Sequence, residues 1–294
     1  MKFGKVEDAS VIDFTLPPTR PETLALLKTY PKRKKFEVYV GCAKWNKTDL
    51  KGFYPPKTKD ELAYYATQFN SIELNATYYN TPSKEQVRTW KDKTPPDFRF
   101  FPKITQSISH YSRLLNTEEK VKDYTDSIAF FEEKLGYVFL QLHENFKPKD
   151  LDRLEHFIST FPKAFPLAVE VRNEEWFADQ QVFEDYCEVL IKNNATNIIV
   201  DTAGRRDMLH MRLTNDAAFI RYVGANHASD YDRLEEWIGR LKEWRSAGLS
   251  KLYFFIHQNV ELESPLLATY FIKKLNEVFD MDLRYPNKHI QTLF

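Results

Sequence analysis

NSIELNATYY, residues 70–79, is the stretch that decides the fold, because it places a carboxylate and an amide inside a strand pattern. Ile72 and Leu74 share one face of a period-2 element, and Glu73 and Asn75 share the other. We therefore expect one face to pack and the opposite face to carry polar chemistry. An antiparallel strand with one solvated face would show the same alternation, so the interpretation depends on whether the pattern recurs.

The pattern does recur, and the polar residues come late in six other strand-like segments. They are Lys103 in 98–104, Gln141 and His143 in 137–144, Glu170 and Arg172 in 167–173, Asp201 in 196–203, Arg221 in 217–224, and His257 and Asn259 in 251–259. A further strand pattern, at 36–43, comes before all of these. Several strands are thus expected to become polar at their carboxyl ends.

Helical patterns separate most of these strands. Apolar residues at helical spacing predict helices over residues 57–69, 83–90, 117–135, 149–160, 180–192 and 230–246 and from residue 264 onward. The spacing from Val121 to Leu135 is the most regular, and Gly136 is expected to end that helix. Residues 204–216 show only a weak pattern, which predicts a short or irregular crossover.

Eight strand patterns alternating with about eight helical ones predict a parallel TIM (β/α)8 barrel ringed by helices. A doubly wound open sheet is the alternative, but the first strand leads into GCAKW instead of GxGxxG, and no P-loop sequence occurs. We expect an N-terminal arm at residues 1–35, the barrel domain at 36–279 and a C-terminal tail at 280–294.

Composition excludes several classes of protein. With 43% hydrophobic and 15% aromatic residues the chain is not disordered, and no apolar run approaches the roughly 20 residues of a membrane span. The first ten residues lack the apolar core of a secretory signal, so we expect a cytoplasmic protein without membrane contacts. Cys42 and Cys187 form neither a disulfide framework nor a CxxC metal motif.

The charges balance at 42 basic and 42 acidic residues, so no global field attracts nucleic acid. We expect any nucleic-acid contact to be local, for example at the basic run 32–35. The sequence pattern carries no information on the oligomeric state.

In a parallel barrel the carboxyl ends of the strands face one mouth, so side chains of inward parity gather there. Parity predicts a constellation of Glu73, Asn75, Lys103, Gln141, His143, Glu170, Arg172, Asp201, Arg221, His257 and Asn259. A buried ion-pair network that merely closes the barrel would also place three acids beside three cations. Because buried charges are costly and weak evidence of stabilisation, a ligand site is the better explanation.

Residue types indicate roles for these side chains. The candidate catalytic residues are the carboxylates of Glu73, Glu170 and Asp201 and the proton carriers His143 and His257. Lys103, Arg172 and Arg221 suit an anionic small molecule or a phosphodiester. Asn75, Gln141 and Asn259 would add polar substrate contacts, and Trp45, Tyr78 and Trp176 would stack on the substrate from loops after strands 1, 2 and 5.

Other kinds of site have weaker support. Glu73, His143, Glu170, Asp201 and His257 are ligand types for zinc or manganese, but no spacing motif such as HExxH occurs and the neighbouring cations would repel a metal ion. We therefore expect no metal and no other cofactor. The GxSxG motif of serine hydrolases is missing. Two carboxylates would also permit glycoside hydrolysis.

A set of motifs between about Phe36 and Phe279 resembles the YecE-like family, also called domain of unknown function 72. The motifs are GCAKW, FYPP, ELNATYYNTP, FRFFPK, FLQLHENF, AVEVRNEEWF, VDTAG, FIRYVG and YFFIHQN. The resemblance implies a TIM barrel and carries over Glu73, Lys103, Gln141, Glu170, Arg172, Asp201 and Arg221 as motif positions. It implies no reaction. The family more often has Pro at the position of His143, and the metal ligands of the similar sugar isomerases and apurinic endonucleases are not matched.

The function that the sequence favours is a metal-independent hydrolase, lyase or isomerase acting on an anionic small molecule or phosphodiester. Carboxylates would carry out acid–base catalysis, and Arg and Lys side chains would bind the anion. The alternatives are a non-catalytic binder of nucleic acid or nucleotide and a structural scaffold.

Overall fold

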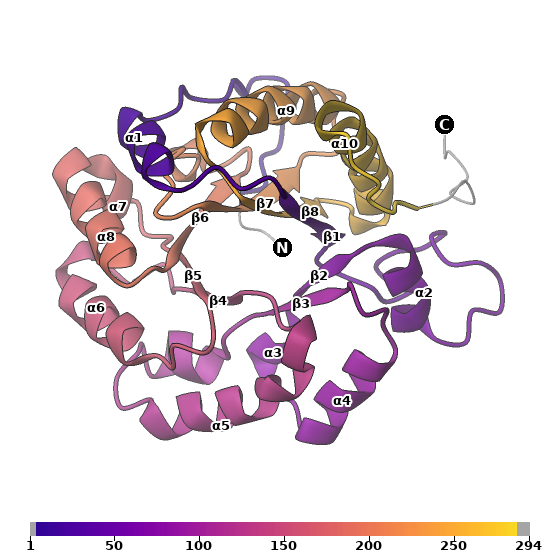
Figure 1. Ribbon diagram of the computed structural model, residues 1–294, viewed down its shortest axis with the longest axis horizontal. Coiled ribbons are helices and arrows are strands. Elements are labelled where there is room, and N and C mark those ends of the chain that lie inside the picture. Colours follow the sequence, from indigo (N-terminus) through magenta and orange to yellow (C-terminus); the bar gives the residue numbers. More distant parts are fainter. Residues whose placement is uncertain (1–3, 287–294) are drawn as a thin grey trace.

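The computed structural model describes residues 4–286, in which parallel strands form two sheets. The strands are β1 Glu37–Cys42, β2 Ser71–Leu74, β3 Arg99–Pro102, β4 Val138–Gln141, β5 Leu167–Glu170, β6 Thr196–Asp201, β7 Ala217–Gly224 and β8 Lys251–Gln258. Six of them pair in the order β1-β8-β7-β6-β5-β4, and β2 pairs with β3. Figure 1 shows the strands around a common axis with the helices outside them. The prediction of parallel strands ringed by helices is confirmed.

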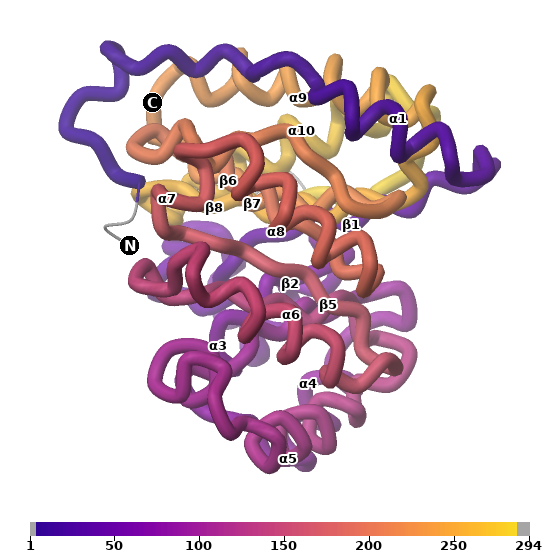
Figure 2. Tube along the Cα trace, turned by 90° about the vertical axis from the view of Figure 1, so that its left-hand side faces the viewer, coloured from indigo at the N-terminus to yellow at the C-terminus, as the bar shows by residue number. Residues whose placement is uncertain are grey.

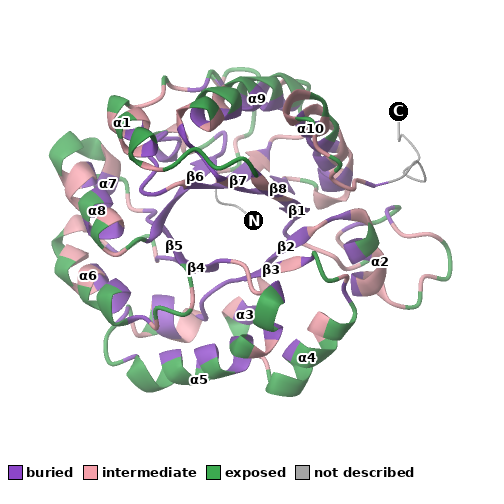
Figure 3. Cartoon of the chain, in the orientation of Figure 1, coloured by how far each residue is buried: buried purple, intermediate pink, exposed green. Residues whose placement is uncertain are grey.

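The helices cover the outer faces of the sheets. They are α1 Pro21–Thr29, α2 Glu61–Gln68, α3 Ala76–Tyr79, α4 Lys84–Asp92, α5 Glu118–Ile128, α6 Leu151–Thr160, α7 Glu175–Ala178, α8 Gln180–Lys192, α9 Ser229–Ala247 and α10 Ser264–Phe279. Short π or 3₁₀ turns are η1 Ser107–Tyr111, η2 Ala129–Lys134, η3 Pro148–Asp150, η4 Arg206–Met208 and η5 Glu261–Glu263. Figure 3 shows buried strands inside and exposed outer helix faces. No helix within residues 4–286 has the length and hydropathy needed to cross a membrane.

Side chains link β1 to β2, where no backbone ladder is formed. The Asn70 amide accepts a hydrogen bond from the Val40 N–H at 2.9 Å and donates one to the Val38 carbonyl at 2.8 Å. The Tyr65 hydroxyl accepts from a β1 N–H at 2.8 Å and donates to a β2 carbonyl at 3.0 Å. A Cβ on Gly41 would lie 2.1 Å from a β2 carbonyl oxygen, so this approach requires glycine.

The other edge of the two-stranded sheet lies beside β4. There the pairing consists of two isolated parallel bridges, Phe100 with Leu135 and Lys103 with Phe139. The result is an α/β barrel-like fold whose strand ends point to one side.

An apolar cluster fills the space enclosed by the strands. Phe101, Phe219 and Phe255 form its centre, with ring centroids 4.8–5.9 Å apart. The interior is therefore a packed core.

The strand predicted for residues 70–79 is shorter than expected. It ends at Leu74, because Asn75 adopts a helical conformation (φ −75°, ψ −14°) and the next residues form the single turn α3. The turn brings Tyr78 back over the strand end.

The helix predicted for residues 117–135 ends at Ile128 and continues as the tighter turn η2, in which Glu132 has φ 52°. Contacts with the end of α4 explain the change. The Lys134 ammonium donates hydrogen bonds to the carbonyls of Lys91 at 2.7 Å and Thr94 at 2.5 Å, where the helix dipole favours a cation. These tertiary bonds override the regular apolar spacing.

The segment between β6 and β7 is irregular, as predicted, and α1 takes the place of a helix there. Figures 1 and 2 show α1 beside α9, and Figure 1 places it between α8 and α9. The Thr23 hydroxyl donates to the Met211 carbonyl at 3.0 Å and accepts from the Leu213 N–H at 3.0 Å. The N-terminal segment thus completes the ring of helices.

The C-terminal segment returns to the amino ends of β2 and β3. Arg284 donates to the Phe69 carbonyl at 2.9 Å and forms an ion pair with Asp97 at 2.6 Å. The remainder of the predicted tail, residues 287–294, lies outside the described residues, as do residues 1–3 of the predicted arm.

Candidate functional site

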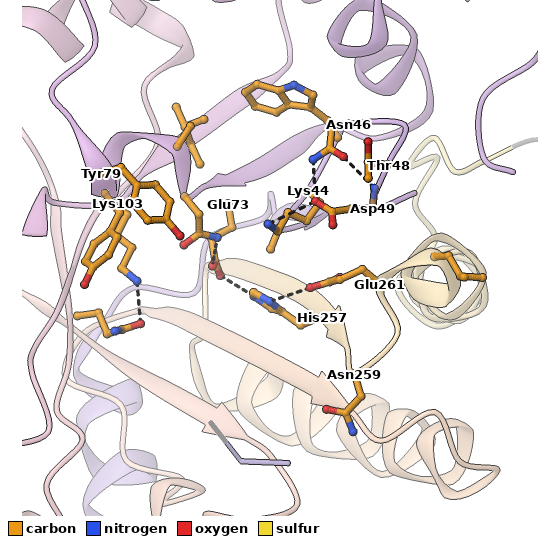
Figure 4. A pocket seen from close by; sticks show the side chains of 18 of the residues that line it. Lys44, Asn46, Thr48, Asp49, Glu73, Tyr79, Lys103, His257, Asn259 and Glu261 are labelled. Atoms are coloured by element: carbon orange, nitrogen blue, oxygen red, sulfur yellow. Dashed lines mark hydrogen bonds and ion pairs between the residues drawn. The ribbon is translucent and has the colours of Figure 1, made fainter. Parts of the chain in front are cut away.

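A cavity of about 1000 Å³ opens at the carboxyl ends of the strands. The structure brings nine of the predicted site residues to its lining: Trp45, Glu73, Asn75, Tyr78, Lys103, Gln141, Arg172, His257 and Asn259. Figure 4 shows Glu73 between Lys103 and His257. Side chains that are far apart in the sequence thus share one space.

Strand parity places these side chains. Alternate residues of a strand share a face, and five of the polar groups follow an inward-facing apolar residue by two positions. The pairs are Phe101 with Lys103, Phe139 with Gln141, Ala168 with Glu170, Phe219 with Arg221, and Phe255 with His257. The apolar core therefore forms the layer directly beneath the polar one.

Arg221 joins two glutamates beneath the cavity. Its Nε and Nη2 donate to Glu73 at 2.8 and 2.9 Å, and its Nη1 donates to Glu170 at 2.6 Å. Both carboxylates are fully buried and Arg221 is 2% exposed. Burial opposes ionisation, but the guanidinium outweighs it and lowers the pKa of Glu73 well below its usual value and that of Glu170 to about 2. Both groups are anions at neutral pH and poor proton donors.

The Gln141 amide oxygen lies between two further cations. It accepts a hydrogen bond from Arg172 Nη2 at 2.7 Å and one from Lys103 Nζ at 2.9 Å. Arg172 also donates from Nε to Glu170 at 2.6 Å. A continuous chain of hydrogen bonds therefore connects Glu73 and Arg221, through Glu170, Arg172 and Gln141, to Lys103 at the cavity floor.

Lys103 differs from the two buried arginines of the site, which pair with carboxylates. It is 4% exposed, and its Nζ lies 4.3 Å from the centre of the Tyr78 ring. No carboxylate within residues 4–286 forms an ion pair with it, and its hydrogen-bond acceptor is the neutral Gln141 amide. Burial, together with the nearby Arg221 and Arg172 guanidinium groups, lowers the pKa of Lys103 to about 7.

His257 lies between two carboxylates. Its Nε2 is 3.1 Å from Glu73 and its Nδ1 is 3.7 Å from Glu261. Burial disfavours the imidazolium, but the two carboxylates outweigh it and raise the pKa of His257 to about 9. At neutral pH this side chain is a cation that carries a transferable proton into the cavity.

Sequence reasoning missed His110, which lies in η1 and also lines the cavity. Its Nδ1 is 2.8 Å from the Ser109 hydroxyl, and its ring lies 5.1 Å from that of Tyr78. Burial and the nearby Lys103 lower the pKa of His110 to about 4, so the imidazole is neutral at pH 7. His143 lies beside it, with the ring centroids 5.2 Å apart, but does not line the cavity.

Loop residues complete the rim. Lys44 forms an ion pair with Asp49 at 3.4 Å, and both line the cavity with Glu261. Asn75 donates to Glu73 at 2.8 Å. Lys44, Asp49 and Glu261 were also missed, because loops carry no periodicity from which a facing direction can be predicted.

Asp201 lies outside the cavity, although parity placed it at the mouth. Ile198 and Val200 face the inner cluster, so Asp201 has the opposite parity. Its carboxylate accepts hydrogen bonds on the outer side of the strand, from Arg206 at 2.5 Å, Arg233 at 2.6 Å and Trp237 at 2.8 Å. It holds α9 and η4 against β6.

Trp176 also lies away from the cavity. It is fully buried, donates from its indole N–H to the Phe146 carbonyl at 2.8 Å and packs against Tyr186 with centroids 5.4 Å apart. It holds the loop after β5 in place. Within residues 4–286 no three His, Cys, Asp or Glu side chains are arranged to hold a metal ion.

Residues 39–289 match the family model described as "Protein of unknown function DUF72". The chain belongs to the DUF72 family. Among curated members, it is 27% identical to the UPF0759 protein YecE of Escherichia coli K12 over 253 residues, which are 79% of this chain and 90% of YecE. It is 27% identical to the UPF0759 protein YunF of Bacillus subtilis over 154 residues, 48% of this chain and 52% of YunF.

Solved structures of DUF72 proteins are similar to this one. A protein from Thermotoga maritima is 28% identical, with a TM-score of 0.64 over 82% of this chain and 99% of that one. A protein from Enterococcus faecalis is 17% identical, with a TM-score of 0.65 over 85% of this chain and 100% of that one. The second likeness bears on the fold alone.

Proposed function

We propose that the two sheets form one closed TIM (β/α)8 barrel. The Asn70 and Tyr65 side chains take over the role of the backbone ladder between β1 and β2, and two isolated bridges take that role between β3 and β4. Closure would place all eight carboxyl strand ends around one mouth, the usual location of active sites in this fold.

We infer that this DUF72 protein is an enzyme that binds an anionic small molecule in the cavity. The observation that carries the inference is Lys103, a cation 4% exposed at the cavity floor that donates a hydrogen bond to the neutral Gln141 amide. A buried charge is costly unless it is paired. An anion bound beside Lys103 would supply the missing partner.

The charges of the lining support the same conclusion. With Lys103 protonated, the ionised lining side chains are four cations, Lys44, Lys103, Arg172 and His257, against three carboxylates, Asp49, Glu73 and Glu261. The Glu170–Arg221 pair beneath adds no net charge. The cavity therefore has an excess of one positive charge, which favours an anionic ligand.

Acid–base chemistry in this site falls to the histidines and the lysine more than to the carboxylates. Glu73 and Glu170 are held as anions by Arg221, whereas the His257 imidazolium is a proton donor that Glu73 orients from 3.1 Å. A metal-independent lyase, isomerase or hydrolase reaction on an anionic substrate fits these groups. A small molecule fits better than a nucleic-acid strand, because Lys103 and Arg172 are at most 7% exposed.

A thermal-shift screen tests the proposal. Sugar phosphates, 2-oxo acids, dicarboxylates, nucleotides and inorganic phosphate are added to the wild-type protein and to Lys103→Met. We expect one anion class to stabilise the wild type by about 2.7 kcal/mol at 100 times its dissociation constant, and not to stabilise the variant. Because the pKa of Lys103 is about 7 and the anion prefers the ammonium form, the effect should be larger at pH 6 than at pH 8.

Lys44→Met is the matched control. Lys44 lines the same cavity, but its side chain is 43% exposed and paired with Asp49. The anion should stabilise this variant less than the wild type but clearly more than Lys103→Met, because Lys44 contributes only an exposed charge to the cavity. Equal stabilisation of wild type and Lys103→Met would contradict the proposal.

A further inference from the structure

We propose that Lys103 is a nucleophile that forms a Schiff base with an aldehyde or ketone carbon of the anionic substrate. The proposal rests on the proposed function and narrows it to carbonyl compounds that carry a carboxylate or phosphate group. It assigns to Lys103 a covalent role in addition to its charge.

The position of the amine is the first support. Lys103 directly follows β3, and the cavity reaches its side chain although only 4% of the residue is exposed. Its Nζ is held at 2.9 Å from the Gln141 amide oxygen and packs at 4.3 Å over the Tyr78 ring. A long flexible side chain is thus held in place at the floor of a large cavity, which reduces the entropy lost on reaction.

The surroundings of the amine are the second support. Lysine amines become nucleophilic where they are desolvated beside other cations, because the ammonium form is disfavoured there. Gln141 accepts hydrogen bonds from both Lys103 and Arg172, so the guanidinium lies next to the amine. The pKa of about 7 that follows leaves about half of the molecules with the neutral amine at neutral pH. A residue needed only as a permanent cation would be better served by arginine.

Two cavity residues can move the protons that the reaction requires. The neutral His110 imidazole can accept a proton, and the Tyr78 ring contacts both groups, 5.1 Å from the His110 ring and 4.3 Å from Lys103 Nζ. The His257 imidazolium can donate one. The site therefore holds an acceptor and a donor in addition to the nucleophile.

The reaction is balanced without any further reagent. The neutral amine attacks the carbonyl carbon, a C–N bond forms, and the C=O π electrons move to oxygen, which takes up a proton as nitrogen releases one. The resulting hydroxyl is protonated and leaves as water, so the C–O bond breaks and the iminium C=N bond forms. Nothing is oxidised or reduced. The iminium can then serve as an electron sink for cleavage or proton transfer at the neighbouring carbon.

The substrate class follows from the cavity. Arg172 lines it beside Lys103 and suits a carboxylate or phosphate. The volume of about 1000 Å³ admits a molecule the size of a 2-oxo acid or a sugar phosphate. Both classes combine an anionic group with an aldehyde or ketone.

Pyridoxal 5′-phosphate is a suitable probe, since it is an aldehyde that carries a phosphate. The wild-type protein is incubated with it at pH 7, reduced with borohydride and mapped by peptide mass spectrometry. We expect the dominant adduct on Lys103, suppressed by inorganic phosphate. Pyridoxal without the phosphate should label Lys103 about tenfold more slowly, because it lacks the charged hydrogen bonds.

Two variants separate this proposal from the anion site on which it rests. Lys103→Arg retains a cation but forms no imine, so it should lose the adduct and keep the stabilisation by phosphate. Lys192→Arg, at an exposed lysine on α8 that does not line the cavity, should retain the Lys103 adduct. Two results would contradict the nucleophile proposal but not the anion site. In the first, phosphate stabilises the wild type but no adduct forms on Lys103. In the second, labelling is spread over surface lysines without an excess at Lys103. Loss of both responses would overturn the two proposals together.

Discussion

Replacing Arg221 by methionine is expected to lower the free energy of unfolding by about 3–5 kcal/mol, because it leaves two buried carboxylates without their shared partner. Glu73 and Glu170 are both fully buried, and Arg221 donates to each of them at 2.6–2.9 Å. Methionine retains much of the side-chain volume. The loss of stability is therefore due to the missing charge and not to a cavity left in the core. Urea denaturation of both proteins at pH 7 measures the difference.

The pH dependence of the free energy of unfolding shows whether the buried carboxylates cause this loss of stability. The pKa values of both carboxyls are lowered in the folded protein, so their contribution to stability is present above the unfolded value of about 4.3 and is lost as pH falls through the folded values. The wild type should therefore lose stability toward pH 2, and the difference in the free energy of unfolding between the wild type and Arg221→Met should become smaller there. Arg88→Met, at an exposed arginine that packs on Phe130, should cost less than about 1 kcal/mol. If Arg221→Met lowers the free energy of unfolding no more than Arg88→Met does, Arg221 does not stabilise the two buried carboxylates as we infer.

Asp201→Asn is expected to lower the free energy of unfolding by about 3 kcal/mol without changing anion binding in the cavity. The substitution preserves the shape of the side chain and removes the charge that pairs with Arg233, which is 1% exposed. Arg233 would keep only the ion pair with Asp230 at 3.0 Å. Urea denaturation gives the stability change, and stabilisation by the anion found in the screen gives the binding.

The second measurement decides where Asp201 acts. Its carboxylate holds α9 and η4 on the outer side of β6, away from the cavity. A variant that folds but no longer responds to the anion would place Asp201 in the site, as parity first indicated. An unchanged response with reduced stability would place it in the support of the fold.

Strand residues of the site were predictable because alternation fixes the face on which each side chain lies. Lys103, Arg221 and His257 each follow a core phenylalanine by two positions, and this spacing is visible in the sequence. The same rule failed at Asp201, because the run TNIIVD is apolar on both faces and does not show which face is inward. In this strand the inward face is fixed by the packing of Ile198 and Val200 in the inner cluster, which only the fold shows.

Loop residues and ionisation states were not predictable in this way. His110 lies in a π-helical turn that no sequence pattern indicates, and Lys44 lies in a loop whose path depends on tertiary contacts. Sequence reasoning gave the carboxylates an acid–base role from their type alone. Only the fold shows that Arg221 joins both glutamates, 148 and 51 residues away in the chain, and keeps them ionised.

The position of α1 was missed for a similar reason. The weak pattern between β6 and β7 predicted an irregular crossover, and the structure has one. Nothing local indicates that a helix from the N-terminal segment fills the resulting gap. The contacts of Thr23 with Met211 and Leu213 join segments about 190 residues apart.

NMR titration of Lys103 is the most direct test of whether it is a desolvated cation that lacks an anionic partner. The ¹³C shift of its ε-methylene, assigned by comparison with Lys103→Arg, is followed from pH 5 to pH 11 with and without the stabilising anion. We expect a pKa of about 7 in the free protein, because burial and the neighbouring guanidinium groups disfavour the ammonium, and a higher pKa with the anion bound. An ordinary lysine pKa of about 10.4 in the free protein would contradict this account of the site.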